Sequence, residues 1–263
     1  MSDVTVDLPA RKSPAAFRLQ GLVVPGAIVL VWLAAVDSGL VRGPLLVPLH
    51  DILTGWLLDE SGREIWPALG VSLLRLAVGF AIGGALGVAA GIALGLSRPA
   101  QQAVAPTVHA VRQITLFAWI PLLTAWFGNG GAAKIAFIAI GVFFPMFVNT
   151  EQGLRTIPAI YREVAFVSRL PLWKRLTKLI LPGALPAILI GVEVALLTAW
   201  IGTVGAEYAI GTGRGVGSYL AAAREQFRMD LVLVGVLVLA IVGYALSRIS
   251  GLAFRRLIKW RAR

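Results

Sequence analysis

Six long apolar runs that contain almost no charge constrain the fold more than any other feature of this sequence. They cover about 22–36, 69–96, 104–127, 132–148, 184–206 and 231–252. A helix needs about 20 apolar residues to cross a bilayer, and the short first run can extend through Leu19 and Leu40. Inside lipid a chain must satisfy its own backbone hydrogen bonds, so each run is predicted to be helical. The sequence therefore predicts an all-α integral membrane protein with six transmembrane helices.

The composition supports lipid rather than water as the surroundings. Hydrophobic residues make up 58% of the chain and charged residues only 14%, whereas a soluble domain carries about a quarter charged residues. The net charge of +11 comes from basic residues in short segments between the apolar runs. This distribution favours membrane topology over nucleic-acid binding, which needs a contiguous basic face.

The distribution of basic residues also predicts the orientation of the chain. With the N-terminus in the cytosol, most of the 24 lysines and arginines fall in cytosolic segments, as the positive-inside rule requires. Residues 1–21 are then a cytosolic tail, because they carry charge and show no signal-peptide cleavage site. Residues 22–252 form the membrane domain, and 253–263 form a basic tail, also cytosolic.

No catalytic or metal-binding motif is present. His50 and His109 are isolated, there is no cysteine, and no Walker A sequence occurs. The glycine-rich stretch from Gly211 to Leu220 lacks the Lys-Ser/Thr ending of a phosphate-binding loop. We therefore expect no enzymatic activity and no metal site in this chain.

The loop at 150–183, between the fourth and fifth spans, has apolar residues at helical spacing with basic residues between them. This pattern predicts one or two short amphipathic helices on the cytosolic surface of the membrane. Such helices either anchor the loop to the membrane or dock a cytosolic partner. The spacing alone leaves both possibilities open.

Two further patterns lie within the spans. Glycines recur every fourth residue in the second span and form a ridge that lets another helix approach closely, either within the chain or in a second copy: Gly79, Gly83, Gly87, Gly91 and Gly95. Charges inside a membrane usually face a cavity or a partner. Arg75, Arg112 and Glu193 are therefore candidates to line an anion path, with a structural Arg–Glu193 pair or snorkelling to the interface as the alternatives.

The cytosolic loop resembles the coupling motif of ABC importer permeases. That motif has an E-A-A element, a glycine four residues later and an I-x-L-P element further on. Here Glu163-Val164-Ala165 and Ile180-Leu181-Pro182 stand at the matching distance, with Arg169 in place of the glycine. The family's glycine allows a sharp turn, and a residue with a side chain adopts a positive φ there only at an energetic cost.

Further matches, spread over 72–263, indicate the sulfonate, taurine and nitrate branch of that family. The stretch at 211–220 resembles the branch's outer gate loop, although a plain flexible loop fits it equally well. The other matching elements are Ile180–Pro186 (ILPGALP), Ala199-Trp200-Ile201-Gly202, Ala206-Glu207, Arg112 followed by Trp119-Ile120-Pro121-Leu122, and Ser72-Leu73 with Arg75.

The resemblance implies a permease subunit of an ATP-driven importer in a bacterial inner (plasma) membrane. The implied substrate is a small oxyanion, first an aliphatic sulfonate or taurine, with nitrate, bicarbonate or a thiamine-precursor-type solute as alternatives. The implied partners are a second permease copy, two cytosolic ATPase subunits that bind ATP and Mg, and a periplasmic or extracellular solute-binding protein. No cofactor is expected in this chain.

The resemblance also implies the site residues. The residues expected to couple to the ATPase are Glu163, Ala165, Arg169, Trp173, Ile180, Leu181 and Pro182. Those expected along the translocation path are Arg75, Arg112, Glu193, Trp200 and Glu207. A self-contained secondary carrier or channel is the alternative class, but it would need an ionisable relay or two related halves, and no repeat is visible in the sequence.

Overall fold

The computed structural model describes residues 14–37, 47–48, 54, 59–158, 160–161, 163 and 167–257. Within these residues the regular secondary structure is entirely helical, which confirms the all-α class. The helices are α1 (Pro14–Asp37), α3 (Glu60–Arg63), α4 (Ile65–Leu96), α5 (Arg98–Val111), the 3-10 helix η1 (Leu116–Trp119), α6 (Ile120–Phe127), α7 (Gly131–Arg155), α9 (Leu172–Arg175), the π-helix η2 (Leu176–Ile180), α10 (Leu181–Ile210), α11 (Val216–Glu225) and α12 (Met229–Leu257).

Four helical segments in the described part of the chain are long and apolar enough to cross a membrane. They are Glu60–Leu96, Gly131–Arg155, Trp173–Ile210 and Met229–Phe254, and they correspond to the second, fourth, fifth and sixth predicted spans. The first predicted span lies in α1, where the apolar helix Gly26–Ala35 is shorter than a span. The structure therefore supports four spans, or five if a bent helix pair counts as one.

That bent pair corrects the third predicted span, which was expected as one helix over 104–127. Instead α5 ends at Val111, and the axis turns by 92° before the segment Leu116–Phe127. Thr115 is extended, with φ −56° and ψ 135°, and Pro121 stands in the first turn of α6. Proline has no N–H to continue a preceding helical turn, but it fits the start of a new helix.

The centre of the fold is α7, which packs against α4 on one side and α10 on the other. The predicted glycine ridge of α4 faces α7 of the same chain. A Cβ atom added at Gly87 would stand 2.6 Å from the carbonyl oxygen of Phe143, and one at Gly91 would stand 2.7 Å from Cβ of Thr150. Only glycine permits this approach, because real Cβ atoms do not come so close.

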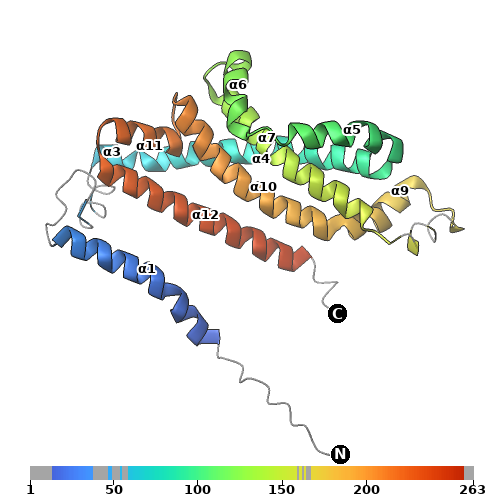
Figure 1. The fold of residues 1–263 in the computed structure, drawn as a ribbon, viewed down its shortest axis with the longest axis horizontal. Coiled ribbons are helices and arrows are strands. Elements are labelled where there is room, and N and C mark those ends of the chain that lie inside the picture. The colour runs from blue at the N-terminus through green and yellow to red at the C-terminus, as the bar shows by residue number, and fades with distance from the viewer. Residues whose placement is uncertain are drawn as a thin grey trace, which may run out of the picture.

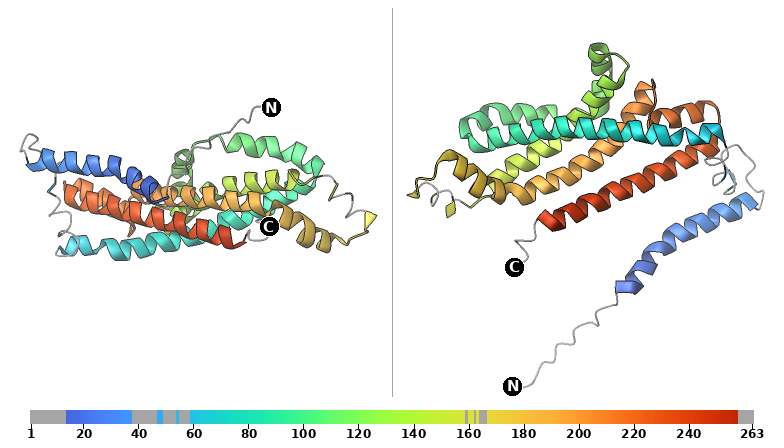
Figure 2. Two further views of the ribbon diagram at one scale, coloured as in Figure 1. Left: turned by 90° about the horizontal axis from the view of Figure 1, so that it is seen from below. Right: turned by 180° about the vertical axis from the view of Figure 1, so that it is seen from behind.

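The helices define two ends of the molecule (Figure 1). At one end, called the α11 end here, α3 and α11 lie beside the start of α4. At the other, called the α9 end, α9 and η2 lead into α10. Helix α12 runs back along α10, and α1 lies beyond α12, away from the rest of the bundle (Figures 1 and 2). The topology predicted from the basic residues assigns the α9 end to the cytosol.

Candidate functional site

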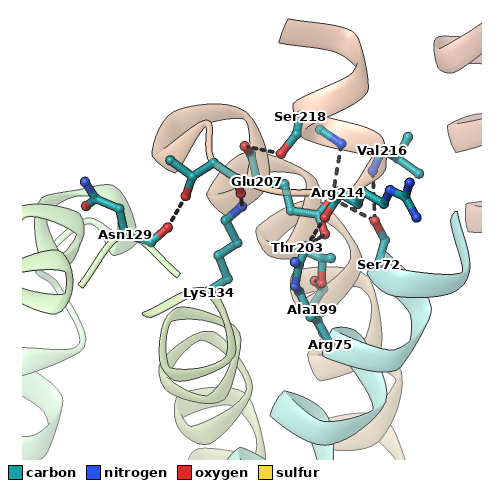
Figure 3. Close-up of polar contacts among 12 residues, drawn as sticks. Ser72, Arg75, Asn129, Lys134, Ala199, Thr203, Glu207, Arg214, Val216 and Ser218 are labelled. Atoms are coloured by element: carbon teal, nitrogen blue, oxygen red, sulfur yellow. Dashed lines mark hydrogen bonds and ion pairs between the residues drawn. The ribbon is translucent and has the colours of Figure 1, made fainter. Parts of the chain in front are cut away.

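Glu207, near the end of α10, is the centre of a buried polar cluster at the α11 end (Figure 3). Its side chain is fully buried. Its carboxylate accepts hydrogen bonds of 2.7 Å from Ser72 Oγ and 2.7 Å from the Arg75 guanidinium, and a third of 3.1 Å from the backbone N–H of Gly217. A buried carboxylate persists only when it is paired and hydrogen-bonded in this way. Glu207 thus joins α4, α10 and α11.

The loop at 211–215, between α10 and α11, is fastened to this cluster through its backbone (Figure 3). Arg75 donates to the carbonyl oxygen of Arg214 at 2.6 Å, and Lys134 donates to that of Thr212. The Thr212 hydroxyl donates in turn to the carbonyl oxygen of Asn129. The sequence left open whether this loop is plainly flexible, but its backbone is held by side chains of two other helices.

Steric constraints explain why the loop has glycine at three of its positions. Gly211 and Gly213 have φ values of +70° and +78°, which residues with a Cβ atom rarely adopt. A Cβ at Gly215 would overlap the carboxyl group of Glu207. These positions let the backbone bend sharply and lie directly over the carboxylate.

A second polar region surrounds the bend between α5 and η1. A cavity of about 410 Å³ opens there, and the exposed Arg112 lies at its wall. Arg112, Gln113, Thr115, Asn149 and Thr198 supply its polar lining, and Pro145 and Val194 are among the apolar lining residues. The arginine and the amide and hydroxyl groups are hydrogen-bond donors, which suit an anionic solute.

A larger cavity of about 700 Å³ lies in the same groove between α7 and α10, towards the α9 end. Its lining includes Thr156 of α7's C-terminal edge, Lys178 of η2, and Ala187 and Ile190 of α10. On α10, Ala187, Ile190 and Val194 share one helical face, because they are three and four residues apart. The two cavities therefore follow one groove from the bend to the α9 end.

The α9 end presents large apolar side chains outward. Val167 is 80% exposed and Trp173 is 74% exposed. Arg169 adopts a φ of +46°, so the arginine takes the left-handed turn conformation expected of the family's glycine. Glu163 is exposed, Ile180 is buried and Leu181 is exposed at the start of α10. Ala165 lies outside the described residues.

Ion pairing also stabilises the outer edge of the α11 end. Arg228 donates hydrogen bonds of 2.6 Å to Asp59 and 2.6 Å to Asp230. The hydrogen bond from Arg228 lowers the pKa of Asp59 below its ordinary value. Burial raises the pKa of the neighbouring Tyr219 to about 12, so its hydroxyl stays neutral at physiological pH.

Comparison with known proteins identifies the family. Residues 83–261 match the family described as "binding-protein-dependent transport system inner membrane component". The chain belongs to this family. The result confirms the resemblance to ABC importer permeases, and it makes the protein a multi-pass membrane permease.

Three relatives of the permease align over nearly its whole length. The SsuC protein of Bacillus subtilis, named for aliphatic sulfonate transport, is 36% identical over 95% of this chain and 92% of its own. The SsuC protein of Escherichia coli, named for the same transport, is 37% identical over 92% of both chains. The bicarbonate transport permease CmpB of Synechococcus elongatus is 31% identical over 88% of this chain and 87% of its own.

The structure distributes the five predicted path residues of the permease over four places. Arg75 and Glu207 form an ion pair of 2.7 Å at the α11 end, and Arg112 lines the cavity at the bend. Trp200 donates from its indole N–H to the carbonyl oxygen of Leu239 at 3.3 Å. Glu193 is half-buried in α10 and has no hydrogen-bond or ion-pair partner among the described residues. The alternative of a structural pair between an arginine and Glu193 is not found among the described residues, where Arg75 pairs with Glu207 instead.

Sequence reasoning missed two buried charges. Lys134 was not among the charges singled out within the spans, but its side chain is fully buried in the first turns of α7. Glu151 was placed in the cytosolic loop, but it is buried and accepts a hydrogen bond of 2.6 Å from Gln101, with Arg155 3.8 Å away. Each lies within one turn or so of a helix end, where hydropathy cannot distinguish a loop from a helix. A usable signal for Lys134 was the Gly-Asn-Gly-Gly turn before it, which marks a helix start.

Proposed function

We propose that this permease is the membrane subunit of an ATP-driven importer for a small oxyanion, with an aliphatic sulfonate or taurine as the first candidate. The observation that carries the substrate class is the identity of 36% and 37% to two proteins named for sulfonate transport over at least 92% of every chain compared. The donor-rich cavity at the bend supports it, because sulfonate oxygens accept hydrogen bonds.

The groove between α7 and α10 is half of the proposed translocation path. Its cavities open on one face of the permease, and along that face Ile190 and Ile201 of α10 are 56% and 68% exposed. A second copy of the permease facing this groove would complete a closed path between two subunits. Arg112 would contact the passing anion near the middle of that path.

ATP hydrolysis would be coupled to the permease at the α9 end. The exposed Val167 and Trp173 form an apolar surface, which a separate cytosolic ATPase that binds ATP and Mg would cover. Both termini would lie on that cytosolic side, and an outer solute-binding protein would dock at the α11 end.

Bicarbonate is the second candidate substrate, because CmpB is 31% identical; nitrate and thiamine-precursor-type solutes remain further alternatives.

A co-purification experiment tests the coupling. The permease is expressed with its candidate ATPase, extracted in detergent and captured, as wild type, as Trp173→Ala and as Glu163→Ala. We expect ATPase capture with the wild type and a loss of about tenfold or more with Trp173→Ala, because a buried interface tryptophan often contributes 2 kcal/mol or more. Leu252→Ala, an exposed substitution in α12, is the matched control and should leave capture unchanged.

A transport assay then separates the importer from a self-contained carrier. Proteoliposomes that hold the assembled complex should accumulate radiolabelled taurine only when ATP and the binding protein are present. Uptake into liposomes that hold the permease alone would contradict the importer and support a carrier or channel.

A further inference from the structure

We propose that Arg75 and Lys134 form an oxyanion-binding site at the α11 end, which the loop at 211–215 now closes with its own carbonyl oxygens. The proposal rests on the proposed function only in taking the ligand to be the transported oxyanion. It assigns to Lys134 a role that the family resemblance did not imply, and it gives the loop a chemical reason to move.

Buried positive charge exceeds buried negative charge in this cluster. Lys134 is fully buried, and the side chain of Arg75 is 13% exposed. Glu207 is the one carboxylate that pairs with Arg75 among the described residues, and Ser72 and Gly217 also donate to it. The ammonium group of Lys134 has a single hydrogen-bond partner in the described part of the chain, the carbonyl oxygen of Thr212. Burying the ammonium of Lys134 is costly when the nearby carboxylate of Glu207 is already paired with Arg75, so a permanent structural role explains Lys134 poorly.

The two cations lie close together on neighbouring helices (Figure 3). A Cβ atom at Gly131, the first residue of α7, would stand 3.9 Å from Nε of Arg75, and Lys134 follows three residues later on the same helix. Residues three apart share a helical face. The guanidinium and the ammonium thus border one small region, which the loop covers.

The atoms that now occupy this region are neutral hydrogen-bond acceptors. The carbonyl oxygens of Arg214 and Thr212 accept from Arg75 and Lys134. A sulfonate group has three acceptor oxygens and a negative charge, so it satisfies both donors and also neutralises the excess charge, which neutral carbonyls cannot do. Gly211 and Gly213 flank Thr212, so the loop carries two residues that adopt other backbone conformations at little steric cost. Oxyanion binding and loop closure therefore compete for the same two donors.

The absence of cysteine from the chain allows a direct test. Val216, fully buried at the start of α11 directly after the loop, is replaced by cysteine in the full-length permease in nanodiscs. The rate of labelling by a membrane-impermeant maleimide then reports how often the loop lifts. Methanesulfonate is the probe, sodium chloride at equal ionic strength controls for salt, and uncharged dimethyl sulfone controls for shape.

We expect methanesulfonate to raise the labelling rate of Val216→Cys about tenfold at about ten times its dissociation constant, because a ligand that binds one state shifts the population by that factor. Chloride and dimethyl sulfone should change the rate little. In the Lys134→Met background the response to methanesulfonate should disappear while basal labelling rises. Lys134→Arg should keep the response, which also shows that α7 tolerates substitution there.

Thr212→Val is the matched control for loosening the loop. It removes the hydroxyl that donates to Asn129 but keeps both cations, so basal labelling should rise and the response to methanesulfonate should persist. The proposal is overturned if methanesulfonate has no effect on Val216→Cys, or if Lys134→Met responds as Thr212→Val does. The labelling experiment needs no ATPase, so its result is independent of the co-purification experiment. A response to methanesulfonate without ATPase capture would support the site and contradict the importer. ATPase capture without a response to methanesulfonate would support the importer and contradict the site.

Discussion

The Glu207 cluster at the α11 end and the exposed surface at the α9 end satisfy their polar and apolar groups in opposite ways. At the α11 end, charged side chains are buried and meet partners within the chain, as Glu207 does with Ser72 and Arg75. At the α9 end, large apolar side chains such as Val167 and Trp173 face outward. Water penalises exposed apolar surface, and a low-dielectric interior penalises unpaired charge.

The difference indicates that a partner at the α9 end would stabilise the fold, whereas a ligand at the α11 end would change its conformation. The exposed apolar side chains of the α9 end are typical of a protein-interaction surface, which agrees with the proposed ATPase subunit. Arg75 and Lys134 at the α11 end already donate hydrogen bonds within the chain, so a ligand that binds them must replace existing contacts. A site of that kind suits a gate, which should be closed when no solute is present.

Removing Arg75 tests the buried end and should give the largest effect. Arg75→Met leaves the carboxylate of Glu207 buried without its counter-ion, and breaking a buried pair costs about 3–5 kcal/mol. Arg75→Met/Glu207→Gln should recover much of this loss, because neither member of the ion pair is then left charged without the other. The free energy of unfolding in detergent, measured for the single and double variants, checks both statements.

The control for Arg75 comes from the other end. Glu163→Ala is an exposed substitution and should change the free energy of unfolding by no more than about 0.5 kcal/mol. If Arg75→Met were as stable as Glu163→Ala, the cluster at the α11 end would contribute no stability, and the contrast between the two ends would fail.

The sequence predicted those parts of the fold that depend on side-chain chemistry. Long apolar runs predicted the four long spans, because lipid burial depends on composition. Arg75 was assigned to the path as a charge inside a membrane span and Glu207 through the family resemblance, and the path role of both stays a prediction. The glycine ridge of α4 followed from its four-residue spacing, although the spacing alone did not say that α7 would lie against it.

The parts that the sequence did not predict depend on the backbone. The break at Thr115 follows Arg112 and Gln113 in a run that is apolar on average, and averaged hydropathy is the same for one helix or two. The partners of Lys134 and Arg75 in the loop are carbonyl oxygens, which every residue possesses, so no residue type signals them. Arg169 shows the converse, because the family pattern predicted a turn at this position although an arginine disfavours it.

Replacing Arg169 tests the exposed end, with a smaller expected effect of the opposite sign. Arg169 has a φ of +46°, which costs a residue with a Cβ atom roughly 1 kcal/mol. Arg169→Gly should relieve that cost and slow backbone hydrogen exchange across residues 167–175 by up to about fivefold. Arg169→Ala keeps the Cβ atom and should show no such protection. Equal protection in both variants would trace the effect to the lost charge rather than to the turn.

The smallest effect concerns the ion pair at the edge of the α11 end. The hydrogen bond from Arg228 lowers the pKa of Asp59 in the folded protein below its ordinary value of 3.8. The ionised form therefore favours the fold: its contribution is fully present above the unfolded pKa and is lost as the pH falls through the folded pKa. Limited proteolysis near Glu60–Arg63 should accelerate only below that ordinary value. Asp59→Asn should show the faster cleavage already at neutral pH and lose this acid dependence, whereas an unchanged acid response in Asp59→Asn would assign it to another group, because Arg228 also binds Asp230.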